Sequence, residues 1–145
     1  MRKLFLKAFE IAKKRNWEQI YVAIDVHDVI LEANYSTDIP TKFLGNAKEV
    51  LQRMSLRKDI VLILYTCSFP REIEQYQKLF QENDIHFKYV NENPECFNTA
   101  FGDFSKKFYF SILLEDKAGF VPDDWYIINS TLDIQDVINN KDNGN

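Results

Sequence analysis

Residues 20–31 read IYVAIDVHDVIL, and the fold prediction starts from this stretch. An uninterrupted apolar run, Ile20–Ile24, leads directly to the carboxylate of Asp25. A short apolar run without polar alternation is typical of a strand that is covered on both faces, as in a parallel sheet. A carboxylate at the tip of such a strand adds nothing to its packing. Asp25 is therefore a candidate for a chemical role, and His27 follows it two residues later.

The same pattern recurs along the chain, with helices expected between the strands. Further strands are predicted over residues 59–66 (DIVLILYT), 85–90 (IHFKYV), 107–114 (KFYFSILL) and 125–130 (WYIINS). The spacing of apolar residues predicts helices over residues 2–15, 43–54, 70–83 and 131–140, the last one capped by Ser130 or Thr131. Strands that alternate with helices pair in parallel through right-handed crossovers. We therefore expect a three-layer Rossmann-like α/β sandwich with a mainly parallel five-stranded sheet, in which residues 91–105 form a loop.

Length and composition indicate one domain over residues 1–145. The chain is 46% hydrophobic and 14% aromatic, and it has no repeat or linker that would divide it. We expect its polar end, residues 140–145, to be disordered. No apolar run approaches the length of a membrane span, about 18 residues. The basic, amphipathic residues 1–15 lack the continuous apolar core and the cleavage site of a secretory signal, so we expect a soluble protein without a membrane partner.

Charge and cysteine content agree with a cytoplasmic protein. The net charge of −4 argues against broad affinity for nucleic acids, since that affinity requires a cationic surface that neutralises phosphates. Cys67 and Cys96 fit neither a metal-site spacing nor a disulfide framework. Both are expected to be free thiols, as in a reducing cytoplasm.

Polar side chains gather where the predicted strands end. Asp25 follows the first strand, Thr66 and Ser68 follow the second, and Glu115 and Asp116 follow the fourth. In open α/β sheets, ligands bind outside the carboxyl ends of the strands. The sequence therefore predicts a site of acids and hydroxyl groups at one edge of the sheet.

The order of these strand ends resembles the motif order of the haloacid dehalogenase-like (HAD) hydrolases, most of which are phosphatases. Residues 25–30, DVHDVI, are similar to the family's first motif, Asp-x-Asp-x-(Thr or Val)-(Leu or Ile), at the end of an apolar strand. VLILYT, ending at Thr66, resembles the second motif, and ILLED, residues 112–116, resembles the fourth, an acidic pair. The match spans about residues 20–130, without room for a large cap domain. The resemblance therefore implies a small, capless member with an open site.

The third motif of the family is a lysine, and Lys107 is the candidate in this chain. Lys106 and Lys107 begin the fourth predicted strand, at the edge opposite Asp25, so a lysine reaches the site only from a loop or if the strand begins later. The resemblance implies that the lysine neutralises charge on the phosphoryl group and that Thr66 donates a hydrogen bond to a phosphoryl oxygen.

The resemblance also implies a magnesium-dependent reaction at Asp25. Its carboxylate would attack phosphorus and form an aspartyl-phosphate, while Mg²⁺ offsets the repulsion between carboxylate and phosphate. Mg²⁺ prefers oxygen ligands and retains waters. The ligands implied are Asp25, the backbone carbonyl of His27 and a carboxylate from Asp116 or Glu115.

The chain departs from the family at His27, where the first motif has its second aspartate, the general acid and base. The backbone carbonyl of this residue still offers a metal ligand. An imidazole can act as acid and base near neutrality, with a different reach from a carboxyl group. Asp28 is an alternative source of a carboxyl group. Three outcomes are open: a slow or altered phosphatase, a different reaction on the same nucleophile, or a protein that only binds.

We therefore expect a magnesium-dependent phosphohydrolase that acts on phosphomonoesters, of a small molecule or a macromolecule, through an aspartyl-phosphate at Asp25. The alternative is a catalytically silent HAD-like binding or regulatory module, in which His27 marks the loss of the acid. A response regulator also carries a phosphorylatable aspartate on an α/β sheet. It is less favoured, because its acidic pair lies early in the chain whereas Glu115 and Asp116 lie late.

Overall fold

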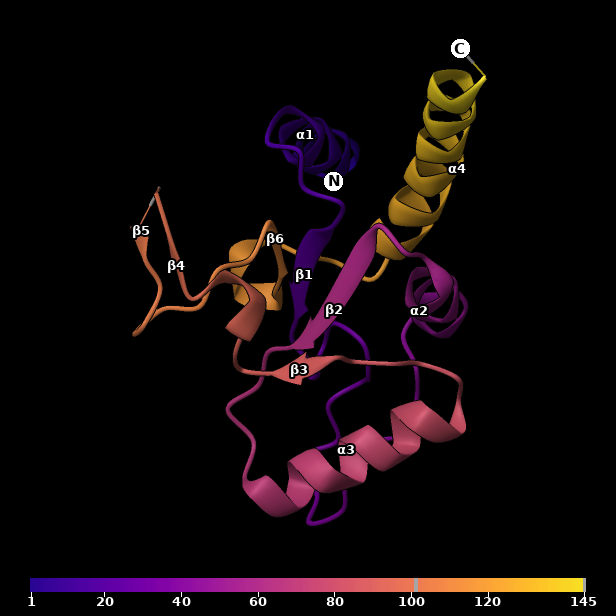
Figure 1. Cartoon of the computed structure of the whole chain (residues 1–145). Coiled ribbons are helices and arrows are strands. Elements are labelled where there is room, and N and C mark those ends of the chain that lie inside the picture. Colours follow the sequence, from indigo (N-terminus) through magenta and orange to yellow (C-terminus); the bar gives the residue numbers. More distant parts are fainter. Residues whose placement is uncertain (101, 145) are drawn as a thin grey trace.

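The computed structural model describes residues 1–100 and 102–144. Its centre is a parallel four-stranded sheet with the strand order β3-β2-β1-β6 (Figure 1). The strands of this sheet are β1 (Ile20–Ile24), β2 (Ile60–Leu64), β3 (Tyr89–Val90) and β6 (Ile112–Leu114), and a separate antiparallel hairpin consists of β4 (Asn98–Thr99) and β5 (Gly102–Asp103). The helices are α1 (Arg2–Lys14), α2 (Ala47–Leu56), α3 (Pro70–Glu82) and α4 (Asp124–Asn143). The predicted Rossmann-like α/β fold is confirmed, with four strands in place of the five expected.

β1 lies inside the sheet, and all of its residues are buried. It pairs in parallel with β2, beginning with Ile20 opposite Ile60, and with β6, beginning with Val22 opposite Ile112. A strand with a parallel neighbour on each side and side chains packed on both faces needs apolar residues at every position. That requirement explains why no polar residue interrupts the run before Asp25.

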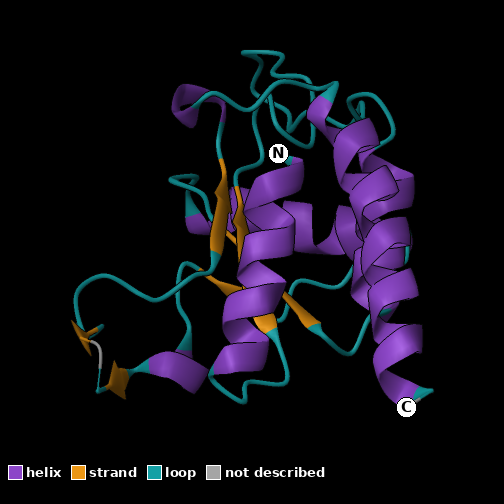
Figure 2. Ribbon diagram, turned by 90° about the horizontal axis from the view of Figure 1, so that it is seen from above, coloured by secondary structure: helices purple, strands orange, loops and turns teal. Residues whose placement is uncertain are grey.

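The two faces of the sheet are covered in different ways. The face that carries Val22 and Ile24 belongs to a core to which all four helices contribute. The opposite face, with Tyr21 and Ala23, packs against aromatic residues of the segment from β3 to β6. In Figure 1, α2 and α4 lie on one side of the sheet and the hairpin lies on the other. Figure 2 likewise shows α4, the helix that ends at the C-terminus, and the hairpin on opposite sides of the molecule.

Residues 125–130, predicted as a fifth strand, form the beginning of α4 instead. Trp125, Ile128 and Leu132 are fully buried at helical spacing. The indole Nε1 of Trp125 donates a hydrogen bond to the carbonyl oxygen of Val29 (2.7 Å). A short apolar run fits a buried strand and a buried helix equally well, and here packing against the core selects the helix.

The start of α4 also differs from the prediction. Its N-cap is Asp123, so Ser130 and Thr131 lie inside the helix rather than at its cap. Both hydroxyl groups donate to the carbonyl oxygen of Ile127 (3.0 and 2.7 Å), which is how such residues satisfy their hydroxyls inside a helix. Neither α4 nor any other described helix is long and apolar enough to cross a membrane.

Other elements match the prediction in place but not in length. β3 and β6 occupy only the last residues of their predicted strands. The segment expected as a loop, 91–105, contains the 3-10 turn η1 (Pro94–Cys96) and the hairpin. α4 continues to Asn143, through most of the tail 140–145 that we expected to be disordered, and residue 145 lies outside the described residues.

Candidate active site

The strand order reverses beside β1, and this reversal creates a crevice at the carboxyl edge of the sheet. From β1 the chain continues through α2 to β2 and through α3 to β3, and then crosses back to β6 on the other side of β1. In open α/β sheets, ligands bind at such a reversal. The backbone N–H of Asp25 donates to the carbonyl oxygen of Leu114 (3.0 Å), so Asp25 stands beside the end of β6, where Glu115 and Asp116 follow.

Three carboxylates meet in this crevice, and we call Asp25, Glu115 and Asp116 the acidic crevice. One oxygen of each lies within 4.8 Å of the others, and all three residues are half-buried. Burial raises the pKa of the Asp25 carboxyl, and the charges of Glu115 and Asp116 raise it further. A hydrogen bond from the backbone N–H of Val26 (2.8 Å) opposes this shift. Three like charges at this separation repel one another, which favours a cation among them.

The donor set fits a hard divalent cation such as Mg²⁺. Octahedral coordination at about 2.1 Å from the metal puts opposite oxygen ligands about 4.2 Å apart. The spread of up to 4.8 Å among the oxygens of the acidic crevice needs only a small closing movement to reach that span. The chain offers the carboxylates of Asp25, Asp116 and Glu115 as ligands, while the backbone carbonyl of His27 stays a predicted ligand.

The two acids after β6 differ in what else they bind. The Oε2 atom of Glu115 accepts a hydrogen bond from the backbone N–H of Ala118 (2.9 Å), so this carboxylate caps the 3-10 turn η2 (Asp116–Ala118). Asp116 instead lines the same cavity as Asp25. Asp116 is therefore the better-placed ligand, because the carboxylate of Glu115 already has a structural partner.

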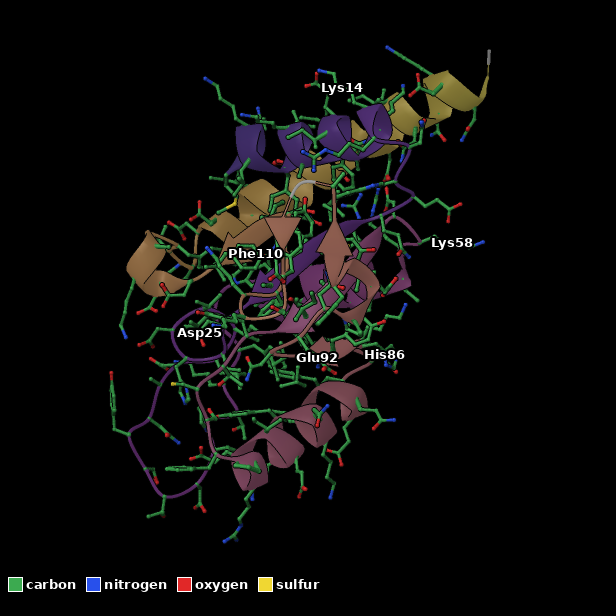
Figure 3. The ribbon with its side chains drawn as sticks, turned by 60° about the vertical axis from the view of Figure 1, so that its left-hand side comes forward. Lys14, Asp25, Lys58, His86, Glu92 and Phe110 are labelled. Atoms are coloured by element: carbon green, nitrogen blue, oxygen red, sulfur yellow. The ribbon has the colours of Figure 1, made fainter. Side chains whose placement is uncertain are left out.

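The acidic crevice opens into a cavity of about 360 Å³. Most residues of the loop 33–40 form one wall, Asp116 and Lys117 lie after β6, and Cys67 and Glu72 line it near the start of α3. Figure 3 shows Asp25 on the side of the molecule from which this loop extends outward, whereas Lys58, before β2, lies at the opposite edge. A small molecule can therefore reach Asp25 from solvent.

A larger cavity, of about 480 Å³, lies between α1 and α4. It opens near the amino end of β1 and contains none of the acidic crevice. Lys13 and Asp142 on its rim form an ion pair with each other (2.7 Å). Because the acids that could hold a metal gather at the smaller cavity, that cavity is the candidate active site.

His27 lines the cavity at Asp25, and one of its ring nitrogens already has a partner. Its Nε2 atom lies 2.9 Å from the hydroxyl oxygen of Tyr76, a residue of α3 that is only 1% exposed. The two rings meet edge to face, with centroids 5.9 Å apart. Burial raises the pKa of the Tyr76 phenol, so it stays a neutral hydrogen-bonding group. This hydrogen bond fixes the orientation of the imidazole.

Sequence reasoning missed Tyr76. It lies on the apolar stripe of α3, and its ring stacks on that of Phe80 with centroids 6.3 Å apart, as a core residue would. The available signal was chemical, because a buried phenol needs a hydrogen-bond partner. Its partner, His27, lies 49 residues away in the sequence, too far for a local pattern to predict.

Asp28, the alternative acid, holds the turn after β1. It adopts a left-handed backbone conformation (φ 58°), and its N–H donates to the carbonyl oxygen of Leu31 (2.8 Å). Its Oδ1 atom accepts a hydrogen bond from the backbone N–H of Ala33 (3.1 Å). Although Asp28 lines the cavity, its carboxylate therefore already stabilises the local fold.

Thr66 is buried, and its polar groups hold the turn after β2. Its N–H donates to the side-chain oxygen of Asn91 (2.9 Å), and the Asn91 amide donates back to the Thr66 carbonyl (2.7 Å). The Thr66 hydroxyl pairs with that of Ser68 (2.8 Å). Thr66 does not line the cavity, and its predicted contact with a phosphoryl oxygen stays a prediction.

The lysine that lines the cavity is Lys117 rather than Lys107. Lys107 is exposed and lies in the irregular segment before β6, and Lys106 lines a different cavity beside Phe108. The late start of β6 thus does not bring either of them to the cavity. Lys117 directly follows Asp116, and that adjacency to the acidic pair was its only signal in the sequence.

One solved structure resembles the whole arrangement. It is that of a conserved protein from Bacteroides thetaiotaomicron, with a TM-score of 0.63 and 22% sequence identity, over 81% of this chain and 92% of that one. At this identity the likeness supports the fold alone. No family model matches the chain, and no curated protein matches it.

Proposed function

We propose that this protein is a magnesium-dependent phosphohydrolase that cleaves phosphomonoesters through an aspartyl-phosphate at Asp25. The observation that supports this most directly is the acidic crevice. Its carboxylates lie within 4.8 Å of one another, at the carboxyl ends of adjacent parallel strands and at the reversal of strand order. The motif order that resembles the HAD hydrolases gives Asp25 the role of nucleophile.

In the first step, a carboxylate oxygen of Asp25 attacks phosphorus and the bond from phosphorus to the leaving alkoxide oxygen breaks. In the second, a water molecule attacks the same phosphorus, which releases inorganic phosphate and restores the Asp25 carboxylate. A Mg²⁺ ion held by Asp25, Asp116 and the backbone carbonyl of His27 would offset the repulsion between carboxylate and phosphate. Lys117, at the same cavity, adds positive charge near the phosphoryl oxygens.

The leaving alkoxide needs a proton, and His27 is the side chain at the position of the family's acid. When Tyr76 donates to Nε2, the proton of the neutral imidazole sits on Nδ1. Nδ1 is then the atom that can hand a proton to the leaving oxygen and take one from the attacking water. Tyr76 acts as a positioning residue in this scheme, since it selects the tautomer.

The test is turnover of nitrophenyl phosphate with and without added Mg²⁺. We expect activity that requires Mg²⁺ and that falls at least about a thousandfold in Asp25→Asn, which corresponds to about 4 kcal/mol in the barrier. Glu74→Gln, which removes an exposed carboxylate of α3, is the matched control and keeps full activity. Unchanged turnover in Asp25→Asn would refute Asp25 as the nucleophile.

A catalytically silent binding or regulatory module is the second candidate. The observation that favours it concerns His27, which stands where the family has its second aspartate. Its Nε2 atom is hydrogen-bonded to the buried Tyr76. This alternative predicts that beryllofluoride and Mg²⁺ bind together at Asp25 while no phosphoester is hydrolysed. Titration calorimetry with beryllofluoride, next to the turnover assay, separates the two candidates.

A further inference from the structure

The cavity carries more acids than the metal site uses, and we call those outside the metal site the outer acids. Besides Asp25 and Asp116, the cavity is lined by three further carboxylates and by one cation, Lys117. The additional acids are Asp28, Asp38 and Glu72. A site that binds a phosphate dianion is expected to surround it with positive charge, so these acids call for another explanation.

The three outer acids differ in how far they are already engaged. Asp28 accepts a hydrogen bond from Ala33, and Glu72 accepts one from the backbone N–H of Phe69 (2.8 Å). Among the residues that the structure describes, the carboxylate of Asp38 has no hydrogen-bond or ion-pair partner. Asp38 thus presents a full negative charge to whatever occupies the cavity.

Tyr35 belongs to the same cavity as these acids. It lines the cavity and is 95% exposed, with a left-handed backbone conformation (φ 50°). Its neighbours hold the loop in place: the side chain of Asn34 accepts from the N–H of Ser36 (3.2 Å) and donates to the carbonyl oxygen of Asp38 (3.2 Å). The aromatic ring is therefore offered to solvent and to a ligand instead of to the core.

The charges of the cavity decide which chemical group fits beside the outer acids. A bound Mg²⁺ is balanced by Asp25 and Asp116, and Lys117 supplies only one charge toward the phosphate. The alcohol portion of a substrate then lies in the field of the outer acids, where a second anionic group is repelled and a cation is attracted. An ammonium group also gains from the face of an aromatic ring such as that of Tyr35. The cavity volume of about 360 Å³ is at the small end of ligand sites and excludes a bulky partner from full burial.

We propose that the substrate is a small phosphate monoester whose alcohol portion carries an ammonium group, held by Asp38 and the ring of Tyr35. This rests on the proposed phosphohydrolase activity and adds the substrate class. The phosphate lies at the acidic crevice and the ammonium group lies between the loop 33–40 and the start of α3. Phosphate esters with a second anionic group are poor substrates for the same reason.

The test compares substrates that have the same shape and different charge. Phosphocholine is paired with neohexyl phosphate, in which carbon replaces the quaternary nitrogen, and aminoethyl phosphate is paired with propyl phosphate. We expect kcat/KM for the cationic member to exceed that for the neutral member by about tenfold or more in at least one pair. Asp38→Asn and Tyr35→Leu each move this ratio toward one.

The matched control is Asp84→Asn, which removes one exposed carboxylate just beyond the far end of α3 and keeps the wild-type ratio. Asparagine suits the left-handed conformation of this residue (φ 57°), so the control variant folds. Ratios near one in both pairs overturn the inference while turnover itself still supports the phosphohydrolase. An unchanged ratio in both Asp38→Asn and Tyr35→Leu overturns the assignment of the ammonium site.

A binding measurement keeps the inference testable when no ester is hydrolysed. Titration calorimetry with Mg²⁺ present measures Kd for the same two pairs. A preference of about tenfold for the cationic member supports the ammonium site even where the proposed hydrolysis fails. Equal Kd values within both pairs refute it.

Discussion

The carboxylates at the two edges of the sheet have opposite surroundings. In the acidic crevice, at the carboxyl edge, acids lie next to acids, and burial together with the neighbouring charges raises the pKa of Asp25. At the amino edge, Asp59 and Asp136 lie on either side of Arg57, whose side chain is 11% exposed. Asp136 also binds Arg53 (2.8 Å).

The pKa values of Asp25 and Asp136 shift in opposite directions because their neighbours differ. Although burial acts to raise the pKa of Asp136, hydrogen bonds from Arg57 and Arg53 hold it below its ordinary value. The acids at the amino edge are matched by arginines of the same chain and tie α2 to α4. Among the residues that the structure describes, no lysine or arginine forms an ion pair with the acidic crevice, as expected of a site completed by a ligand. An acid that serves the fold and an acid that serves a ligand can thus be told apart by their partners.

The largest expected effect comes from removing the arginine that pairs with both acids at the amino edge. Arg57→Met leaves two half-buried carboxylates without their guanidinium, and we expect the free energy of unfolding to fall by about 2–3 kcal/mol in urea titrations. Lys58→Met, at the exposed neighbouring position, is the control and changes stability by less than about 0.5 kcal/mol. Phosphatase turnover per folded molecule stays unchanged in both. A stability loss in the control equal to that in Arg57→Met would contradict the comparison.

The next largest effect tests which carboxylate of the acidic crevice binds Mg²⁺. Asp116→Ala should weaken Mg²⁺ binding by about tenfold, or about 1.4 kcal/mol, in titration calorimetry. Glu115→Ala should change Mg²⁺ affinity by less than about threefold and lower stability by about 1 kcal/mol, because its carboxylate caps η2. The reverse order of Mg²⁺ affinities would show that Glu115 is the ligand. If neither substitution matters, the metal site is refuted.

The next effect concerns the imidazole beside the crevice. Tyr76→Phe keeps the stacked ring and removes the hydrogen bond to His27, so turnover of alkyl phosphates should fall by about fivefold. Nitrophenyl phosphate should be nearly unaffected, because nitrophenolate leaves without a proton. His27→Ala should show the same selectivity more strongly, and Tyr126→Phe, at an exposed tyrosine of α4, should show none. If His27→Ala turned over both substrates at the full rate, the imidazole would have no role. His27 would then contribute only its backbone carbonyl.

The smallest effect is a difference in acid stability. The folded pKa of Asp136 lies below its ordinary value of 3.8. Its stabilising contribution is therefore present above pH 3.8 and is lost as the pH falls through the folded pKa. Asp136→Asn should reduce the slope of unfolding free energy against pH in this acid range. The raised pKa of Asp25 acts in the opposite sense, so Asp25→Asn should not reduce the slope, and an identical loss in both variants would contradict the comparison.

Local sequence patterns predicted much of the fold. The continuous apolar runs at β1 and β2 and the amphipathic stripes of α1 and α3 were confirmed close to their predicted bounds. The acidic crevice was also accessible to sequence reasoning, because residues directly after parallel strands meet at one edge of the sheet. The assigned roles of Asp25, Thr66 and His27 stay predictions.

Two features became clear only from the tertiary structure. Residues 125–130 form a helix because Trp125 fits the core and bonds to Val29, which no local period encodes. Lys117 lines the cavity instead of Lys107 because it comes after β6, at the carboxyl edge, whereas Lys107 lies in the irregular segment before that strand.

The sequence by itself therefore located the strands of the central sheet at least in part, the polar residues that follow them and the nucleophile candidate, since a strand buried on both faces shows as a continuous apolar run. The tertiary structure decided which polar groups are already engaged. It pairs His27 with Tyr76 and Glu115 with η2, and it leaves Asp116 and Asp38 directed to the cavity. The physical reason is that a hydrogen bond depends on positions in space within about 3 Å, whereas sequence spacing fixes positions only within one helix or strand.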